Sequence, residues 1–277
     1  MNTKAGIGMK KMLLGLLIAV PAFTFAGEAS AGLFDSGIPV GWTCTGNCGT
    51  LGANGVVTLA PSGGTQYGWV ASNTGITGLG PFGGTDGSTL RSPLFSANAG
   101  DDLVFQFDYV TSDGAGFADY AWARLLDSGG TQVAMLFTAR TTPGGNTVPG
   151  FGLPPIDATI NPAVVTITPG GPSWSPLGGY SGACYNTGCG YTGWVEATYD
   201  IAVAGNYILE FGVVDWLDQI YDSGMAFDGL MVGGKPFGCG EPGQPPCPTV
   251  IPEPSTILLL GAGLVGLGLW GRKRMVK

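Results

Sequence analysis

The chain of 277 residues contains no histidine. Without an imidazole it cannot form a Ser-His-Asp or Cys-His catalytic site, or a zinc site with imidazole ligands. The chemistry that remains open belongs to carboxylates, cysteines and aromatic rings, and each of these groups occurs in local clusters.

The stretch "DWLDQIYD" carries three aspartates close together, Asp215, Asp218 and Asp222. One loop can bring their carboxylates to the same point, and oxygen atoms are the ligands that calcium prefers. The spacing is not that of an EF-hand loop. The alternative interpretation, which the sequence favours, is an acidic turn in contact with solvent.

Paired carboxylates could also hydrolyse glycosidic bonds without histidine. The candidates are Asp108, Glu196 and Glu210, which lie on predicted strands, opposite to or between core positions. Such residues are interpreted more simply as the solvent face of a sheet. The sequence therefore predicts that the protein is not an enzyme, with a surface glycoside hydrolase as an alternative.

Six cysteines form three pairs that are close in sequence: Cys44 and Cys48, Cys184 and Cys189, Cys239 and Cys247. In an exported protein an even number of cysteines indicates disulfides, and local pairing is the simplest of the fifteen possible arrangements. Bonds of this kind would make the loops rigid. The alternative is a metal site built from the first two pairs, although their spacing is wider than that of a usual zinc knuckle.

Residues 141–190 are rich in proline and glycine and interrupt the strand pattern. A loop this long in a compact domain is usually functional or disordered. The segment and its border carry Trp174, Tyr180, Tyr185 and Tyr191. These rings would suit a surface on which sugars stack. The alternative is that they cover one edge of the sheets.

Alternation of apolar and polar residues is the dominant pattern, and it is clearest in "DDLVFQFDYVT" and "GNYILEFGVVD". Further strands are predicted at 56–59, 67–71, 89–95, 120–126, 133–138, 164–168, 194–201 and 226–232. About ten short strands separated by Gly, Asp, Asn and Pro turns indicate an all-β fold, a single β-sandwich of the jelly-roll kind, over residues 32–234.

The two flanks of this domain carry other signals. Lys4, Lys10 and Lys11 precede a short apolar run and the small residues Ala29 and Ala31, which predicts a signal peptide over residues 1–31, cleaved by signal peptidase. Residues 235–251 are rich in proline and predict a stiff stalk. Between residues 32 and 251 there are 4 basic residues and 17 acidic ones, a net charge of 4 − 17 = −13. Nucleic acid is therefore excluded as a partner.

Residues 255–271 form an uncharged run of 17 residues, and Arg272, Lys273 and Arg274 follow it. As a helix the run would span roughly 25 Å, the short end of what crosses a bilayer. The basic residues would hold that end in the cytoplasm. The run is rich in glycine, so the sequence predicts a transient anchor in the inner membrane.

Pro252, Glu253 and Pro254, followed by this glycine-rich span and the basic cluster, resemble the PEP-CTERM sorting signal of Gram-negative bacteria. The resemblance covers residues 252–277. It implies that an exosortase recognises the tripeptide, removes the tail and passes the protein to the cell surface or the exopolysaccharide matrix. It implies a destination and no activity.

The segment "GLFDSGIPVGWT" looks like the opening of jelly-roll surface modules of the MAM and adhesin type, and "YDSGMAFDGLMV" looks like their closing strand. The resemblance runs from Phe34 to Val232. By position it implies that Asp35 and Asp228 hold a structural calcium ion. Such modules often have glutamate at the first position, and Asp35 has a shorter side chain.

These observations predict an exported protein of the cell surface or extracellular matrix. Its expected role is a non-catalytic one, as a carbohydrate-binding, structural or adhesive component of a biofilm, with exopolysaccharide as the candidate ligand. A protein-binding module of a surface layer is an alternative. No cofactor is required by the sequence, and structural calcium is the one that the acidic residues suggest.

Overall fold

The computed structural model describes residues 32–141 and 147–238. The predicted signal peptide, most of the predicted stalk with Cys239 and Cys247, and the sorting signal with its apolar span lie outside the described residues. Within the described ranges, no helix is long and apolar enough to cross a membrane.

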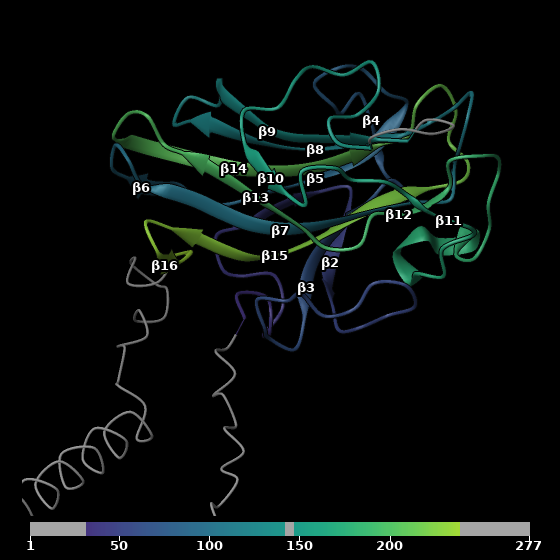
Figure 1. Cartoon of the computed structure of the whole chain (residues 1–277), viewed down its shortest axis with the longest axis horizontal. Helices are drawn as coiled ribbons and strands as arrows, with labels where there is room; N and C mark the ends of the chain where they lie inside the picture. Colours follow the sequence, from purple (N-terminus) through teal and green to yellow (C-terminus); the bar gives the residue numbers. More distant parts are fainter. Residues whose placement is uncertain (1–31, 142–146, 239–277) are drawn as a thin grey trace, which may run out of the picture.

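The described chain folds into two antiparallel β-sheets that face each other (Figure 1). In order across the first sheet lie β1 (Thr43–Thr45), β5 (Asp86–Arg91), β14 (Gly205–Val214), β8 (Tyr120–Asp127) and β9 (Gln132–Arg140). Two short strands extend it: β4 (Ile76–Thr77) pairs with β5, and β6 (Phe95–Ala97) pairs with β14.

The second sheet has the order β10 (Thr159–Asn161), β13 (Val195–Asp200), β7 (Asp102–Thr111), β15 (Ser223–Val232), β3 (Tyr67–Ala71) and β2 (Asn47–Leu51). The short strands β11 (Thr168–Pro169), β12 (Gly190–Tyr191) and β16 (Lys235–Pro236) lie beside this path. One short 3-10 helix, η1 (Ser175–Tyr180), lies near β11 and β12 at the right of Figure 1. The all-β sandwich expected from the alternation is thus confirmed.

Aromatic rings from both sheets fill the space between the layers. Phe107 of β7 stacks on Phe137 of β9 with ring centroids 3.8 Å apart. Phe211 of β14 stacks on Phe227 of β15 at 4.0 Å. The inward positions of the two longest alternating segments are buried, because successive side chains of a strand point to opposite faces.

Two of the predicted strands are wrong. Residues 56–59 form no strand, and Val57 makes only an isolated bridge with Asn54. In the segment 164–168 only Thr168 belongs to a strand, β11. Val57 and Val165 are nonetheless buried. A loop that places single apolar side chains on the core produces the same alternating pattern as a strand, without strand pairing.

The sandwich also extends beyond the expected boundary at residue 234. Strand β16 pairs with the end of β15. The next residue, Phe237, is 5% exposed, and its ring lies 4.9 Å from that of Phe95 and 5.6 Å from that of Trp42. The start of the predicted stalk is therefore part of the folded domain.

Candidate functional site

Four aromatic side chains, three from loops and one from the end of η1, form a contiguous group at one end of the sandwich. We call Phe117, Tyr180, Tyr185 and Tyr221 the aromatic cluster. The ring centroids of Phe117 and Tyr185 are 5.7 Å apart, those of Tyr185 and Tyr221 are 5.2 Å apart, and those of Tyr180 and Tyr221 are 4.7 Å apart. Tyr185 is 44% exposed, and the other three are partly exposed. The cluster can therefore be reached from solvent.

Backbone hydrogen bonds hold the loop of Tyr185 in place. The N–H of Tyr185 donates to the carbonyl of Ser112 at 2.9 Å, and the N–H of Ala115 donates to Thr187 at 2.8 Å. Gly114 permits this approach, because a Cβ there would lie 2.6 Å from the carbonyl oxygen of Asn186. The loop itself is closed by the Cys184–Cys189 disulfide. The aromatic cluster is thus built on a braced loop.

The four aromatic residues singled out in the sequence have different positions. Tyr180 and Tyr185 belong to the cluster, whereas Tyr191 packs against a buried group around Trp174. Trp174 is 0% exposed, and its Nε1–H donates to the Tyr67 hydroxyl at 3.0 Å. The expectation that Trp174 offers a surface to a sugar is therefore wrong, because this ring belongs to the core.

Sequence reasoning missed Phe117 and Tyr221. Both lie in short loops that contain glycine or aspartate, and in the sequence both are outside residues 141–190. A partly exposed aromatic residue beside a turn signal is the only local feature that marks them.

The three aspartates of "DWLDQIYD" lie between β14 and β15. Asp215 and Asp222 are buried, which contradicts the expectation of a solvated acidic turn for these two, and Asp218 is partly exposed. Burial raises the pKa of Asp215 to about 8, and the charges of Asp222 and Asp86 act in the same direction. Burial also raises the pKa of Asp222 to about 6. The calcium prediction for these residues remains a prediction.

Asp35 and Asp228 lie close enough for their charges to interact. Asp35 accepts backbone N–H bonds from Thr65 at 2.6 Å, Gln66 at 3.0 Å and Gly32 at 2.8 Å. Burial opposes ionisation of Asp35, but these bonds outweigh it and lower the pKa. Both Asp35 oxygens therefore already have donors that fix the first loop, and calcium binding here stays a prediction.

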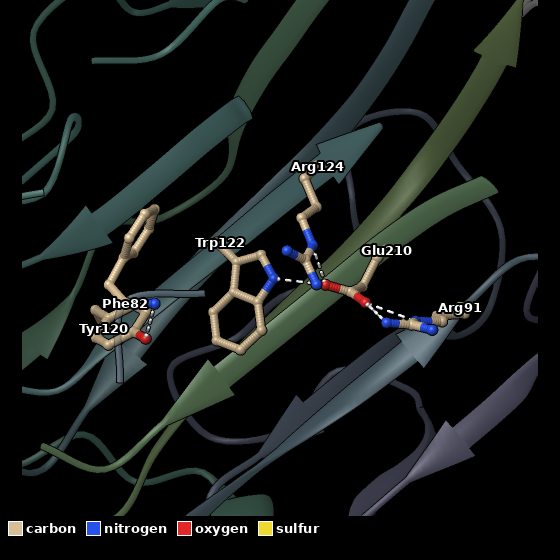
Figure 2. A network of polar contacts seen from close by, with 6 residues as sticks. All are labelled: Phe82, Arg91, Tyr120, Trp122, Arg124 and Glu210. Atoms are coloured by element: carbon tan, nitrogen blue, oxygen red, sulfur yellow. Dashed lines mark hydrogen bonds and ion pairs between the residues drawn. The ribbon is translucent and has the colours of Figure 1, made fainter. Parts of the chain in front are cut away.

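Glu210 is held by a charged network on the outer face of the first sheet (Figure 2). It accepts Nε–H bonds from Arg91 at 2.6 Å and from Arg124 at 2.5 Å, and the Nε1–H bond of Trp122 at 2.9 Å. Burial of Glu210 opposes its ionisation, but the hydrogen bonds from Arg124 and Trp122 and the two arginine charges lower its pKa. Glu210 is therefore ionised and fully paired.

Two of the three hydrolase candidates are buried, although the sequence predicted that they face solvent. Glu210 is 0% exposed and Asp108 is 1% exposed. Residues 192–194 account for part of this burial, since Thr192 donates its hydroxyl to Asp108 at 3.3 Å. Loops and long side chains cover outer faces of both sheets, so alternation alone does not tell which outer positions reach water.

The described cysteines form the local disulfides Cys44–Cys48 and Cys184–Cys189, as predicted. The first links β1 of one sheet to β2 of the other. None of the four described cysteines is available for a metal site.

Comparison with protein families identifies a PEP-CTERM protein-sorting motif at residues 250–273. This confirms the resemblance of the tail. The motif implies an exported protein with a C-terminal membrane-anchored sorting signal, processed by an exosortase. It covers a small part of the chain and leaves the described domain unassigned.

Among solved structures, similar chains include the K1 cleaved adhesin domain of Lys-gingipain from Porphyromonas gingivalis, with 11% identity, 72% of this chain and 94% of that chain covered, and a TM-score of 0.34. The C-terminal family 22 carbohydrate-binding module of Clostridium thermocellum Xyn10B has 13% identity, 76% and 96% coverage, and a TM-score of 0.30. At this similarity neither identifies a ligand for this chain. No curated protein matches the chain.

Proposed function

We propose that the β-sandwich of this chain, which carries an exosortase sorting motif, is a non-catalytic carbohydrate-binding module. It acts at the cell surface or in the extracellular matrix as an adhesive or structural component of a biofilm. The observation that supports this proposal is the partly exposed aromatic cluster at one end of the sandwich.

The chemistry of the aromatic cluster suits a sugar. Three of its four members are tyrosines, each with a flat apolar face and a hydroxyl that can donate or accept a hydrogen bond. A pyranose ring offers the complementary pattern, with C–H groups on its faces and hydroxyls around its edge. The disulfide and the backbone bonds of the 184–189 loop restrict the rings before binding, which lowers the entropic cost of ordering them.

Charge narrows the class of ligand. The region from residue 32 to 251 has a net charge of 4 − 17 = −13. A polysaccharide with many carboxylates or sulfates would be repelled by such a protein. The proposed ligand is therefore a neutral polysaccharide.

The carboxylates support a role without catalysis. A glycosidase needs one carboxylic acid that stays protonated and can reach the glycosidic oxygen. Glu210 is ionised and paired with two arginines. The carboxyls whose pKa burial raises most, such as Asp119 and Asp215, are 0% exposed and beyond the reach of a polymer.

The test is binding of the full chain, purified in mild detergent, to soluble neutral β-glucan and to anionic alginate by affinity electrophoresis. We expect retardation by the neutral polymer and not by alginate. The double variant Tyr185→Ala, Tyr221→Ala should bind about thirtyfold more weakly, since two aromatic contacts of about 1 kcal/mol each are lost.

Phe151→Ala provides the matched control, because Phe151 is an aromatic residue that is 70% exposed outside the aromatic cluster. It should bind like the natural chain. Equal affinity of the double variant and the natural chain would contradict the assignment of the site. Release of new reducing ends from the glucan would contradict a non-catalytic role.

A further inference from the structure

Six aspartates lie at strand ends and in loops at the same end of the sandwich, and we call this group the acidic end. Antiparallel pairing aligns the end of β14 with the starts of β5 and β8, and the end of β7 with the start of β15. Each of these strand ends has an aspartate within two residues of it. The members are Asp86, Asp113, Asp119, Asp215, Asp218 and Asp222.

Four of the six aspartates of the acidic end are buried, Asp86 and Asp218 are partly exposed, and none of the six forms an ion pair. Asp113, Asp119 and Asp215 are 1%, 0% and 0% exposed. Both ion pairs of the described residues involve Glu210 instead. Arg140 lies nearby, but its guanidinium stacks on Trp216 at 4.5 Å and its Nε–H donates to the carbonyl of Ala118 at 2.8 Å. Buried carboxylates are normally paired or bound to metal.

Three carboxylate oxygens of this group are buried and have no hydrogen-bond donor. They are both oxygens of Asp215 and Oδ2 of Asp113. Asp119 differs, because its Oδ1 accepts the backbone N–H of Trp216 at 2.8 Å and its Oδ2 accepts the Ser223 hydroxyl at 2.6 Å. A buried acceptor left unsatisfied costs about 1–3 kcal/mol, and more if charged. A cation bound at these oxygens would remove this cost.

We propose that the acidic end binds one calcium ion, with Asp215 as the central ligand. Asp222 and Asp86 are the further ligands, since their charges act on Asp215 and the Asp215 N–H donates to the Asp86 carbonyl at 2.8 Å. Asp113, whose charge acts on Asp119 as that of Asp215 does, adds its unsatisfied Oδ2. Only Asp215 and Asp222 of these four stand in the acidic stretch that is visible in the sequence. Asp86 is the first residue of β5, and Asp113 follows the end of β7.

Calcium fits this group better than other metals. It accepts six to eight oxygens in flexible geometry, whereas magnesium demands a regular octahedron and keeps several waters, which a buried site cannot supply. Zinc prefers nitrogen and sulfur ligands. Within the described ranges, no three acidic or cysteine side chains converge on one point as they stand. Binding would therefore draw the carboxylates of the loops together.

Protons are the competing positive species. Burial raises the pKa of Asp113 to about 7 and that of Asp215 to about 8, so both can hold a proton near neutral pH when no ion is bound. Calcium would displace these protons. The experiment must therefore compare the chain with and without calcium at one fixed pH.

Thermal unfolding of the full chain at pH 8 tests the proposal, first in EDTA and then in excess CaCl2. With free calcium about a hundredfold above the dissociation constant, we expect the Tm to rise by several degrees. Asp215→Asn should lose most of this shift. Asp102→Asn, which removes the same charge from an exposed position at the far end of β7, should keep it.

The EDTA arm separates loss of binding from loss of folding. Asp215→Asn removes a buried, unpaired charge, so its Tm in EDTA should equal or exceed that of the natural chain. The proposal would be overturned if calcium did not change the Tm of the natural chain, or if Asp215→Asn kept the full rise in Tm. An equal rise in Tm with MgCl2 would overturn the choice of metal.

Discussion

At the residue scale, Asp108 shows how burial changes a carboxyl on the outer face of a strand. Its side chain is 1% exposed and accepts one hydroxyl bond, from Thr192. Burial raises its pKa to about 7. Tyr67 faces it, and burial together with the charge of Asp108 raises the pKa of that phenol to about 12. Asp108 is therefore protonated in the folded chain at mildly acidic pH.

This burial predicts a pH-dependent gain in stability for Asp108→Asn. Between the ordinary value of 3.8 and about 7, Asp108 keeps its proton when folded and loses it when unfolded. The folded state binds more protons in this window, so the natural chain loses stability as pH rises through it. An asparagine cannot ionise, so the variant should gain relative stability over this window, on the order of a few kcal/mol.

Urea unfolding from pH 4 to pH 8, in EDTA throughout, measures this difference. Val203→Ala, at a position 67% exposed, serves as the control, because it changes no titratable group and its difference should not vary with pH. A constant difference for Asp108→Asn as well would mean that Asp108 does not titrate as its burial implies.

At the element scale, β14 contributes side chains to both faces of the first sheet. Its inward residues fill the core, and its outward residues support the network of Figure 2. Gly212, on the outward face, lies under the indole of Trp122, whose Nε1–H donates to Glu210. A glycine in a strand interior usually weakens the strand, and here it allows the close approach of an aromatic ring.

Gly212→Ala should therefore destabilise the domain, because the new Cβ would overlap the Trp122 ring. Overpacking of this kind costs about 1–3 kcal/mol. Chemical denaturation followed by tryptophan fluorescence measures it. Gly179→Ala is the control, since a Cβ there would meet nothing within 4 Å. Similar stability of the two variants would show that the sheet can shift away from the ring.

At the scale of the whole molecule, residues from both ends of the described domain close the sandwich together. Trp42 lies near the beginning and Phe237 near the end, and their ring centroids are 5.6 Å apart. Phe34 contacts Trp42 at the same distance. The segment that leads to the sorting motif thus leaves from a packed corner of the domain.

Phe237→Ala should cost about 3–5 kcal/mol, the usual loss for a buried phenylalanine. The full chain in detergent and its circular dichroism melt provide the measurement. Val203→Ala, at a position 67% exposed, is expected to be neutral. If Phe237→Ala left the Tm unchanged, the folded domain would end at residue 234, as the sequence predicted.

The sequence predicted those features that depend on neighbours along the chain. Strand alternation in β7, β8, β14 and β15, the two local disulfides and the sorting motif each occupy a short segment, so their signals are complete within it. The absence of histidine also excluded whole classes of catalysis before any fold was known.

The tertiary structure alone decided which residues meet and which reach water. Trp174 and Tyr185 lie in one glycine-rich segment and look alike in sequence, but one packs on Tyr67 and the other stays exposed. Asp86 and Asp215 are distant along the chain and adjacent in space, because β5 and β14 pair. Burial and the clustering of charges depend on contacts between strands that are distant in the sequence, so no local pattern can specify them.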